Sequence, residues 1–295
     1  MSGTLFLSGS ALAASGGVQA LGWPADWRRS IRLMGGFWQG SFSLSGPEWV
    51  DLDLISAFYE WLGRDLRERT AAGITWRGLV YEMELTHAGS RRRRTLDLMV
   101  NAVDVSYQTD GEVRSAGFST QAQAIARYGR KEEILSCDNV PAATAQAYRA
   151  RYLAGHAWPW PRPVSLGGED QTVLEVRACG YVFTGQWLYL QAGDGADHDL
   201  DHWISAIVGT AYGLSSDHGG STSGAGDCEF LKAGNVASNT LQVKEAVDSD
   251  MRPWSKLEEL AGLGDSSGDP WRVWVDADRR LHYQPVDLAP RYYLR

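Results

Sequence analysis

The chain has 295 residues, of which 44% are hydrophobic and 22% are charged, and this composition excludes a disordered protein. Single cores stop growing at about 250–300 residues, so the length favours two domains. The formal net charge of −8, from 28 Lys and Arg against 36 Asp and Glu, argues against a protein that binds nucleic acid by neutralising phosphates.

The cysteines and the N-terminal residues bear on where the chain is made. Cys137, Cys179 and Cys228 form no close pair, and their odd number favours a reducing compartment over a disulfide scaffold. Residues 5–15 have the small and apolar residues of a signal peptide, but no Lys or Arg precedes them, so we expect a first β-strand. No run of 18 apolar residues occurs in the sequence, and we therefore expect no membrane span.

Strands of a first β domain are predicted on both sides of a single helix. Residues 37–44 and 76–83 have the two-residue period of strands, and both faces of the second segment carry apolar side chains. Such a strand has a core on one face and a helix or a neighbouring subunit on the other. A further long strand is expected to run through residues 96–101.

A helix is predicted at 47–62, between these strands. The Ser-Gly-Pro-Glu sequence at 45–48 is typical of a capping box with proline in the first turn. The apolar residues that then share one helical face are Val50, Leu54, Phe58 and Leu62. We expect this helix to cover one side of a β-barrel.

Four consecutive arginines stand out in this acidic chain: Arg91, Arg92, Arg93 and Arg94. Alternate residues of a strand face opposite sides, so the run does not predict one patch of four charges. Two interpretations stay open. The arginines are a solvated strand start whose charges discourage edge pairing, or they contact an acidic ring of neighbouring subunits or its lumen.

A domain boundary is predicted between residues 157 and 158. The prolines at alternate positions in 158–163 favour a stiff connector. The first domain, 1–157, is expected to end in a connecting helix at 141–154, with Pro141 in its first turn and a glycine stop at Gly155.

The second domain, 158–295, is expected to repeat the unit of a β-barrel and a covering helix. The fold class is therefore predicted as mainly β with a few helices. The elements expected in this second domain are a strand at 185–191, a helix at 199–212 that begins with Asp199 as N-cap, a helix at 255–262 and a hairpin at 271–285.

The most metal-like cluster is 194–202, with four carboxylates and two histidines in nine positions. Calcium could use such oxygens, but the glycine and terminal glutamate of a calcium loop are absent. His198 and His202, four residues apart, are the pair that zinc could use. The simpler interpretation is that the acids cap the following helix, so we expect no metal ligands and leave a bound cation open.

No constellation in the sequence predicts an enzyme. Residues 217–223 contain Asp, His and Ser in a Gly-Ser loop, without the strand-to-helix turn that positions a nucleophile. Glu82 and Glu84 could act on a glycan, but they share one strand face. We therefore expect no catalytic residue and no cofactor. Thirteen Trp residues leave a carbohydrate-binding module open as an alternative.

The order of these elements resembles that of phage tail-tip hub proteins. Features in both halves of the chain carry the resemblance: Gly-Gly-Phe-Trp at 35–38, the capped helix, Leu-Gly-Arg at 62–64, Trp-x-Gly-x-Val at 76–80, Leu-x-x-Met-x-Asn at 96–101, Tyr-Gly-Arg at 128–130, Gly-Tyr at 180–181 and Arg-Leu-His-Tyr-Gln-Pro at 280–285.

The resemblance implies a structural virion protein that is made in the host cytoplasm and located at the tail tip. Such hub proteins form a trimeric ring with two similar barrels per subunit. The ring joins the sixfold tail tube to the threefold spike or fibre, contacts the distal tail ring and the tape-measure protein, and leaves a channel for DNA without sequence-specific binding. The alternatives are a distal tail protein, which forms a hexameric ring, and the carbohydrate-binding module.

Overall fold

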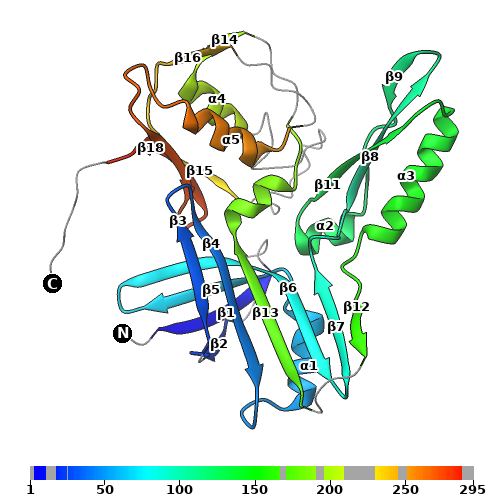
Figure 1. Ribbon diagram of the computed structural model, residues 1–295, viewed down its shortest axis with the longest axis vertical. Helices are drawn as coiled ribbons and strands as arrows, with labels where there is room; N and C mark the ends of the chain where they lie inside the picture. The colour runs from blue at the N-terminus through cyan, green and yellow to red at the C-terminus, as the bar shows by residue number, and fades with distance from the viewer. Residues whose placement is uncertain are drawn as a thin grey trace.

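The computed structural model describes residues 3–10, 18–24, 26–166, 171–190, 196–208, 230–244 and 251–287. Strands dominate these residues and a few helices accompany them, which confirms the expected mainly β class (Figure 1). The described strands form open sheets rather than closed barrels, which corrects the barrel-like architecture. Within these residues no helix is long and apolar enough to cross a bilayer.

Twelve strands form a large central sheet. Its main path runs β15-β18-β17-β4-β13-β6-β5-β1-β2, while β3 pairs with β4, and β7 pairs with β6 and β12. The bounds are β1 Thr4–Ser10, β2 Gln19–Gly22, β3 Arg28–Arg32, β4 Gly35–Ser45, β5 Arg64–Thr70, β6 Gly73–His87, β7 Ser90–Thr95, β12 Arg162–Leu166, β13 Val173–Gly180, β15 Lys232–Val236, β17 Trp271–Val275 and β18 Arg280–Pro285.

The strand at the centre of this sheet comes from late in the chain. β13 is antiparallel to both β4 and β6, and places Val176 opposite Phe42 on one side and Met83 on the other. All three side chains are buried. The predicted boundary at 157/158 therefore falls between strands that share one sheet, and the pairing of β13 joins the two segments.

The first helix, α1 (Asp51–Glu60), buries Leu54, Ala57 and Phe58 against the central sheet. The helix predicted at 47–62 exists, but the capping box does not. The chain turns at Gly46 with a φ of 88°, and the N-cap is Val50, which has no side-chain hydrogen bond to the helix. The expected strand at 96–101 is also wrong, because β7 ends at Thr95 and the chain turns before β8.

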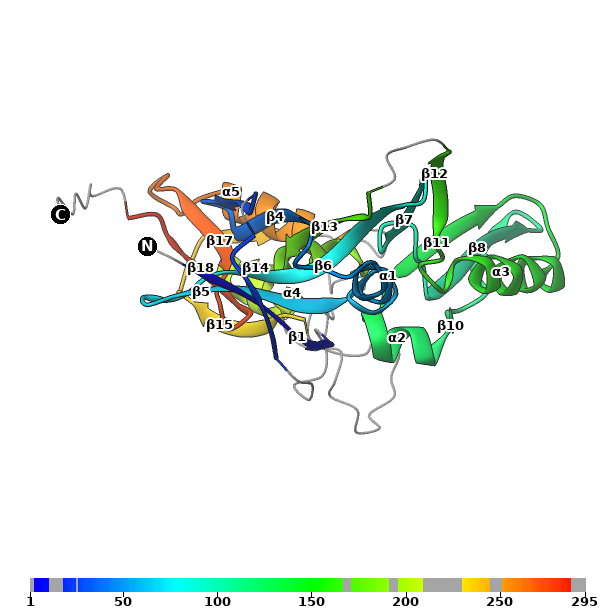
Figure 2. The same cartoon turned by 90° about the horizontal axis from the view of Figure 1, so that it is seen from below.

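A smaller sheet and two helices form an arm, residues 102–156, which projects from the central sheet (Figures 1 and 2). Its elements are β8 Ala102–Thr109, β9 Glu112–Ser115, β10 Ser119–Thr120, α2 Ala122–Tyr128, β11 Glu132–Cys137 and α3 Ala142–His156. The arm has its own small core around Val105, Tyr107 and Ala145. The helix predicted at 141–154 continues through Gly155, so the expected glycine stop is wrong.

The remaining elements follow β13 in the chain. They are the 3-10 helix η1 Tyr181–Gln186, β14 Asp197–Asp199, α4 Leu200–Val208, β16 Gln242–Lys244 and α5 Pro253–Gly262. Of these, α4, α5, β14 and β16 lie near β15 and β18 (Figure 1). The residues next to η1 and α5 contact the arm, because the Trp187 carbonyl accepts from the Glu132 amide at 2.7 Å and Arg252 Nη1 donates to the Glu132 carbonyl at 3.2 Å. The predicted terminal hairpin is confirmed as β17 and β18, and α5 contains the predicted helix at 255–262.

One other expectation for this part of the chain needs correction. No strand forms at 185–190, because the chain turns there as η1, in which the Thr184 hydroxyl donates a 2.6 Å hydrogen bond to the Tyr181 carbonyl; residue 191 lies outside the described residues. Asp199 is the last residue of β14 and directly precedes α4, at the expected N-cap position. The helix α4 is described only to Val208, so residues 209–212 lie outside the described residues.

Candidate functional site

One face of the central sheet carries polar side chains in register across five strands, and we call it the charged face. Its first row is Arg28, Ser41, Arg177, Glu82 and Thr95, and its second row is Ser43, Glu175, Glu84 and Arg93. Successive residues of a strand point to opposite faces, so the residues between them, such as Phe42, Val176 and Met83, enter the core.

The carboxylates of this face lie beneath its arginines. Arg177 Nη1 donates to Glu82 Oε1 at 2.8 Å, and Arg93 Nη2 donates to Glu84 Oε2 at 2.9 Å; Arg91 also binds Glu84. The arginine side chains are 40–50% exposed, whereas those of Glu82 and Glu84 are 10% and 5% exposed. Over Glu82 and Glu84, solvent therefore meets guanidinium groups, whereas Asp26 and Glu175 line the part of the face beside Ser43.

The structure divides the predicted arginine run among three environments. Arg91 and Arg93 belong to the charged face, and Arg92 is exposed. Arg94 is buried, and its Nη1 donates to the carbonyls of Phe58 at 2.8 Å and Tyr59 at 2.7 Å. These are last-turn carbonyls of α1, which lack partners within the helix, so Arg94 acts as a helix cap and not as a surface contact.

Burial has an electrostatic consequence for this cap. It lowers the pKa of the Arg94 guanidinium, although the nearby Tyr128 hydroxyl acts in the opposite direction. A third carbonyl, that of Pro159, accepts from Arg94 Nε at 3.0 Å. The cap therefore also fixes the connector after α3 against the first helix.

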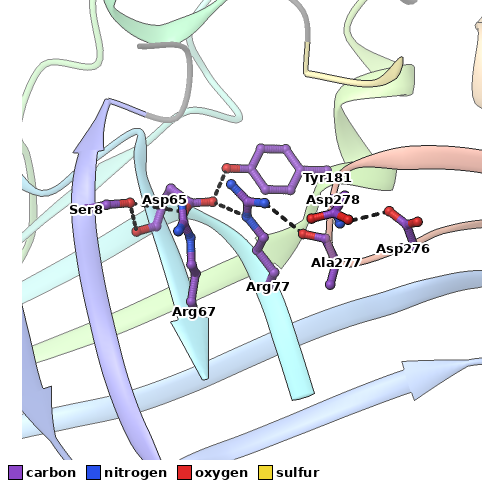
Figure 3. A network of polar contacts seen from close by, with 8 residues as sticks. All are labelled: Ser8, Asp65, Arg67, Arg77, Tyr181, Asp276, Ala277 and Asp278. Carbon is purple, nitrogen blue, oxygen red and sulfur yellow. Dashed lines mark hydrogen bonds and ion pairs between the residues drawn. The ribbon is translucent and has the colours of Figure 1, made fainter. Parts of the chain in front are cut away.

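A second polar cluster is centred on the buried Asp65 and joins η1 and the turn between β17 and β18 to strands β1, β5 and β6 (Figure 3). Asp65 Oδ1 accepts from Arg77 Nε at 2.8 Å, and Oδ2 accepts from the Ser8 hydroxyl at 3.0 Å and from Arg67. Arg77 Nη1 also donates to the Ala277 carbonyl at 2.7 Å.

The ionisation of Asp65 follows from these neighbours. Burial raises the pKa of its carboxyl, but the charge of Arg77 and hydrogen bonds from Arg77 and Tyr181 outweigh burial and hold the pKa below its ordinary 3.8. Three of the donors, Ser8, Arg77 and Tyr181, come from elements other than β5, so the cluster is a structural joint. Sequence reasoning missed it, because Asp65 is one of several charged residues in Arg64–Thr70 and the pattern gives no sign of where its partners lie.

The two histidines of the metal-like cluster lie against each other. His198 and His202 stack with ring centroids 4.1 Å apart and an interplanar angle of 22°, whereas zinc ligands point their ring nitrogens at one ion. Among the described residues, no three His, Cys, Asp or Glu side chains are grouped so that they could hold a metal. Asp194 and the loop at 217–223 lie outside the described residues.

The tryptophans divide between cores and surface. Trp61, Trp76, Trp203 and Trp254 are buried, whereas Trp160 is 62% exposed and Trp23 is 47% exposed.

Comparisons of the chain with family models, with curated proteins and with solved structures gave no match. The charged face is therefore the main structural ground on which a function can be argued.

Proposed function

We propose that the protein is a structural subunit of a phage tail tip, in which copies of the chain form the hub ring between the tail tube and the spike or fibre. The observation that carries this proposal is the charged face, where exposed arginines cover buried carboxylates on a chain of net charge −8. Opposite charges on different surfaces of one chain favour head-to-tail contacts between copies. Such contacts generate a ring when the rotation between copies closes.

The composition of the charged face also suits a ring with a channel for DNA. Each of Arg91, Arg93 and Arg177 already has a carboxylate partner in Glu84 or Glu82. Affinity for DNA grows with the number of phosphates that free cations neutralise. These three paired arginines have less affinity for passing DNA than three unpaired arginines would have.

The test is the native mass of the purified chain over a concentration series, measured by light scattering after size exclusion. A mass of three times 32.4 kDa supports the hub ring. A hexamer would favour the distal tail protein instead. A monomer at every concentration that binds glycans on an array would favour the carbohydrate-binding module.

A matched pair of variants links the mass to the charged face. Arg91→Gln, Arg93→Gln and Glu84→Gln together remove the ion pairs without leaving a buried carboxylate unpaired. We expect this variant to be monomeric. The control, Arg114→Gln with Glu112→Gln, removes an exposed pair on β9 and should keep the wild-type mass. Gold-labelled antibody on assembled phage should then decorate the tail tip, and labelling elsewhere contradicts the location.

A further inference from the structure

A cavity of about 410 Å³ opens in the charged face where β3, β4, β13 and β6 meet. The polar residues that line it are Arg28, Arg29, Ser30, Gln39, Ser41, Tyr81 and Arg177. Its volume falls within the range of about 300–1,000 Å³ that is typical of ligand sites. The cavity therefore has room for a small molecule or for a side chain of another protein.

Two of the three guanidinium groups in the cavity already have carboxylate partners. Arg29 pairs with the buried Glu68, and Arg177 pairs with Glu82 at 2.8 Å. Within the described part of the chain, Arg28 forms neither an ion pair nor a hydrogen bond through its side chain. Arg28 is therefore the guanidinium group of the cavity that has no carboxylate paired with it, although Asp26 and Glu175 line an adjoining hollow that Arg28 also lines.

The hydroxyl of Tyr81 is a second unused group in this cavity. No hydrogen-bond partner for it occurs among the residues that the structure describes. Burial, together with the charges of Cys179 and Glu82, raises the pKa of Tyr81 to about 12. The hydroxyl therefore keeps its proton at neutral pH and can donate it to an anion.

We propose that this cavity binds a single carboxylate group, which pairs with the Arg28 guanidinium and accepts a hydrogen bond from the Tyr81 hydroxyl. One unpaired guanidinium group beside a neutral hydroxyl suits a singly charged group, and the carboxylates of Asp26 and Glu175 in the adjoining hollow disfavour a phosphate monoester, which carries nearly two negative charges at neutral pH. The carboxylate comes from an acidic side chain of a neighbouring copy or from a free organic acid. The first source rests on the proposed ring, whereas the second does not.

The experiment titrates the full-length chain with propionate, which has the carboxylate end of a glutamate side chain, and detects binding by saturation-transfer NMR. We expect Arg28→Gln to weaken binding at least about tenfold, because a charge-assisted hydrogen bond is lost. Tyr81→Phe should weaken it several-fold. Arg114→Gln, the control on β9, should leave it unchanged, and methyl phosphate should bind less tightly than propionate.

Light scattering on the same samples identifies the source of the carboxylate. If propionate dissociates the oligomer and Arg28→Gln is monomeric, the carboxylate belongs to a neighbouring copy. If propionate binds through Arg28 without changing the mass, the ligand is a free acid, and this holds even for a chain that forms no ring. Propionate binding that is absent, or equal in all variants, together with an unchanged mass for Arg28→Gln, overturns the site while leaving the ring proposal intact.

Discussion

The Tyr181 hydroxyl donates a 2.5 Å hydrogen bond to Asp65 Oδ1 and so connects residues 116 positions apart in sequence. Both residues are buried, and the guanidinium group of Arg77 lies 5.8 Å from the centre of the Tyr181 ring. Through Arg77 the same contact reaches the Ala277 carbonyl in the turn between β17 and β18. One phenol group therefore stabilises the junction between η1, the central sheet and the terminal hairpin.

Removing that hydroxyl should destabilise the fold without changing its shape. Tyr181→Phe leaves the ring in place and deletes one hydrogen bond to a charged group, so we expect a loss of about 1.5–3 kcal/mol in the free energy of unfolding. Urea denaturation followed by tryptophan fluorescence measures this difference. Tyr148→Phe, on the exposed surface of α3, is the matched control. Equal midpoints for both variants would show that the contact contributes nothing.

The carboxylate of Asp65 should make the free energy of unfolding depend on pH in the acidic range. Because the folded-state pKa lies below 3.8, its contribution is complete above the unfolded-state pKa and is lost as pH falls through the folded-state pKa. Asp65→Asn should cost about 3–5 kcal/mol at pH 7, since Arg77 loses its buried partner. The difference in unfolding free energy between the two proteins should shrink below pH 4. A difference that stays constant down to pH 3 contradicts this assignment.

Because Arg94 caps α1, substitutions at Arg94 and Arg92 should change the free energy of unfolding by unequal amounts. Arg94→Leu deprives buried carbonyls of α1 of their charged donor, and we expect a loss on the order of 3 kcal/mol. Arg92→Leu removes an exposed side chain, and its effect should stay within about 0.5 kcal/mol. Chemical denaturation of both variants gives the comparison. Similar losses for the two would contradict the capping role of Arg94.

Lys131 should make the protein more stable at alkaline pH. Its ammonium group donates to the carbonyls of Leu96 and Asp97, both at 2.7 Å, while burial lowers its pKa from 10.5 to about 8. Between these values the unfolded chain binds more protons than the folded one, so stability rises with pH. Relative to Lys131→Met, the wild type should gain on the order of 2–3 kcal/mol from pH 7 to pH 11.

The same denaturation experiment can contradict this assignment. Urea titrations at one-unit pH intervals should show the gain beginning near pH 8. A gain confined to pH values above 10 would mean that the ammonium group is solvated in the folded protein. Lys244→Met, in β16, tests whether the loss of any lysine produces the same trend.

Local patterns were sufficient to predict elements whose partners are close in sequence. The apolar face of α1 and the hairpin of β17 and β18 both follow from side-chain spacing. The place of β13 in the sheet could not be predicted, because its two-residue period is the same whichever strands lie beside it. The 3-10 helix at Tyr181 was missed for a similar reason, because its first residues, Tyr181, Val182 and Phe183, suit a strand as well as a turn.

The candidate site was partly visible in the sequence. Strand alternation indicated that the arginine run faces two sides, and Arg93 and Arg94 do differ in this way. The sequence could not show that Arg94 enters the end of α1, since its carbonyl partners belong to the backbone and leave no residue-type signal. Arg28 and Tyr81 were not singled out, because the cavity that they share forms only when β3 and β6 lie in one sheet.

The central position of β13 also sets an order of events during synthesis. A ribosome that has released β4 and β6 has produced two strands whose shared neighbour has not yet been translated. Until residue 180 emerges, the apolar side chains that β13 covers and the backbone edges of both strands stay open to other nascent chains. A fragment that ends at residue 157 would therefore aggregate, and a separate peptide with the sequence of β13 would inhibit this aggregation by pairing with β4 and β6.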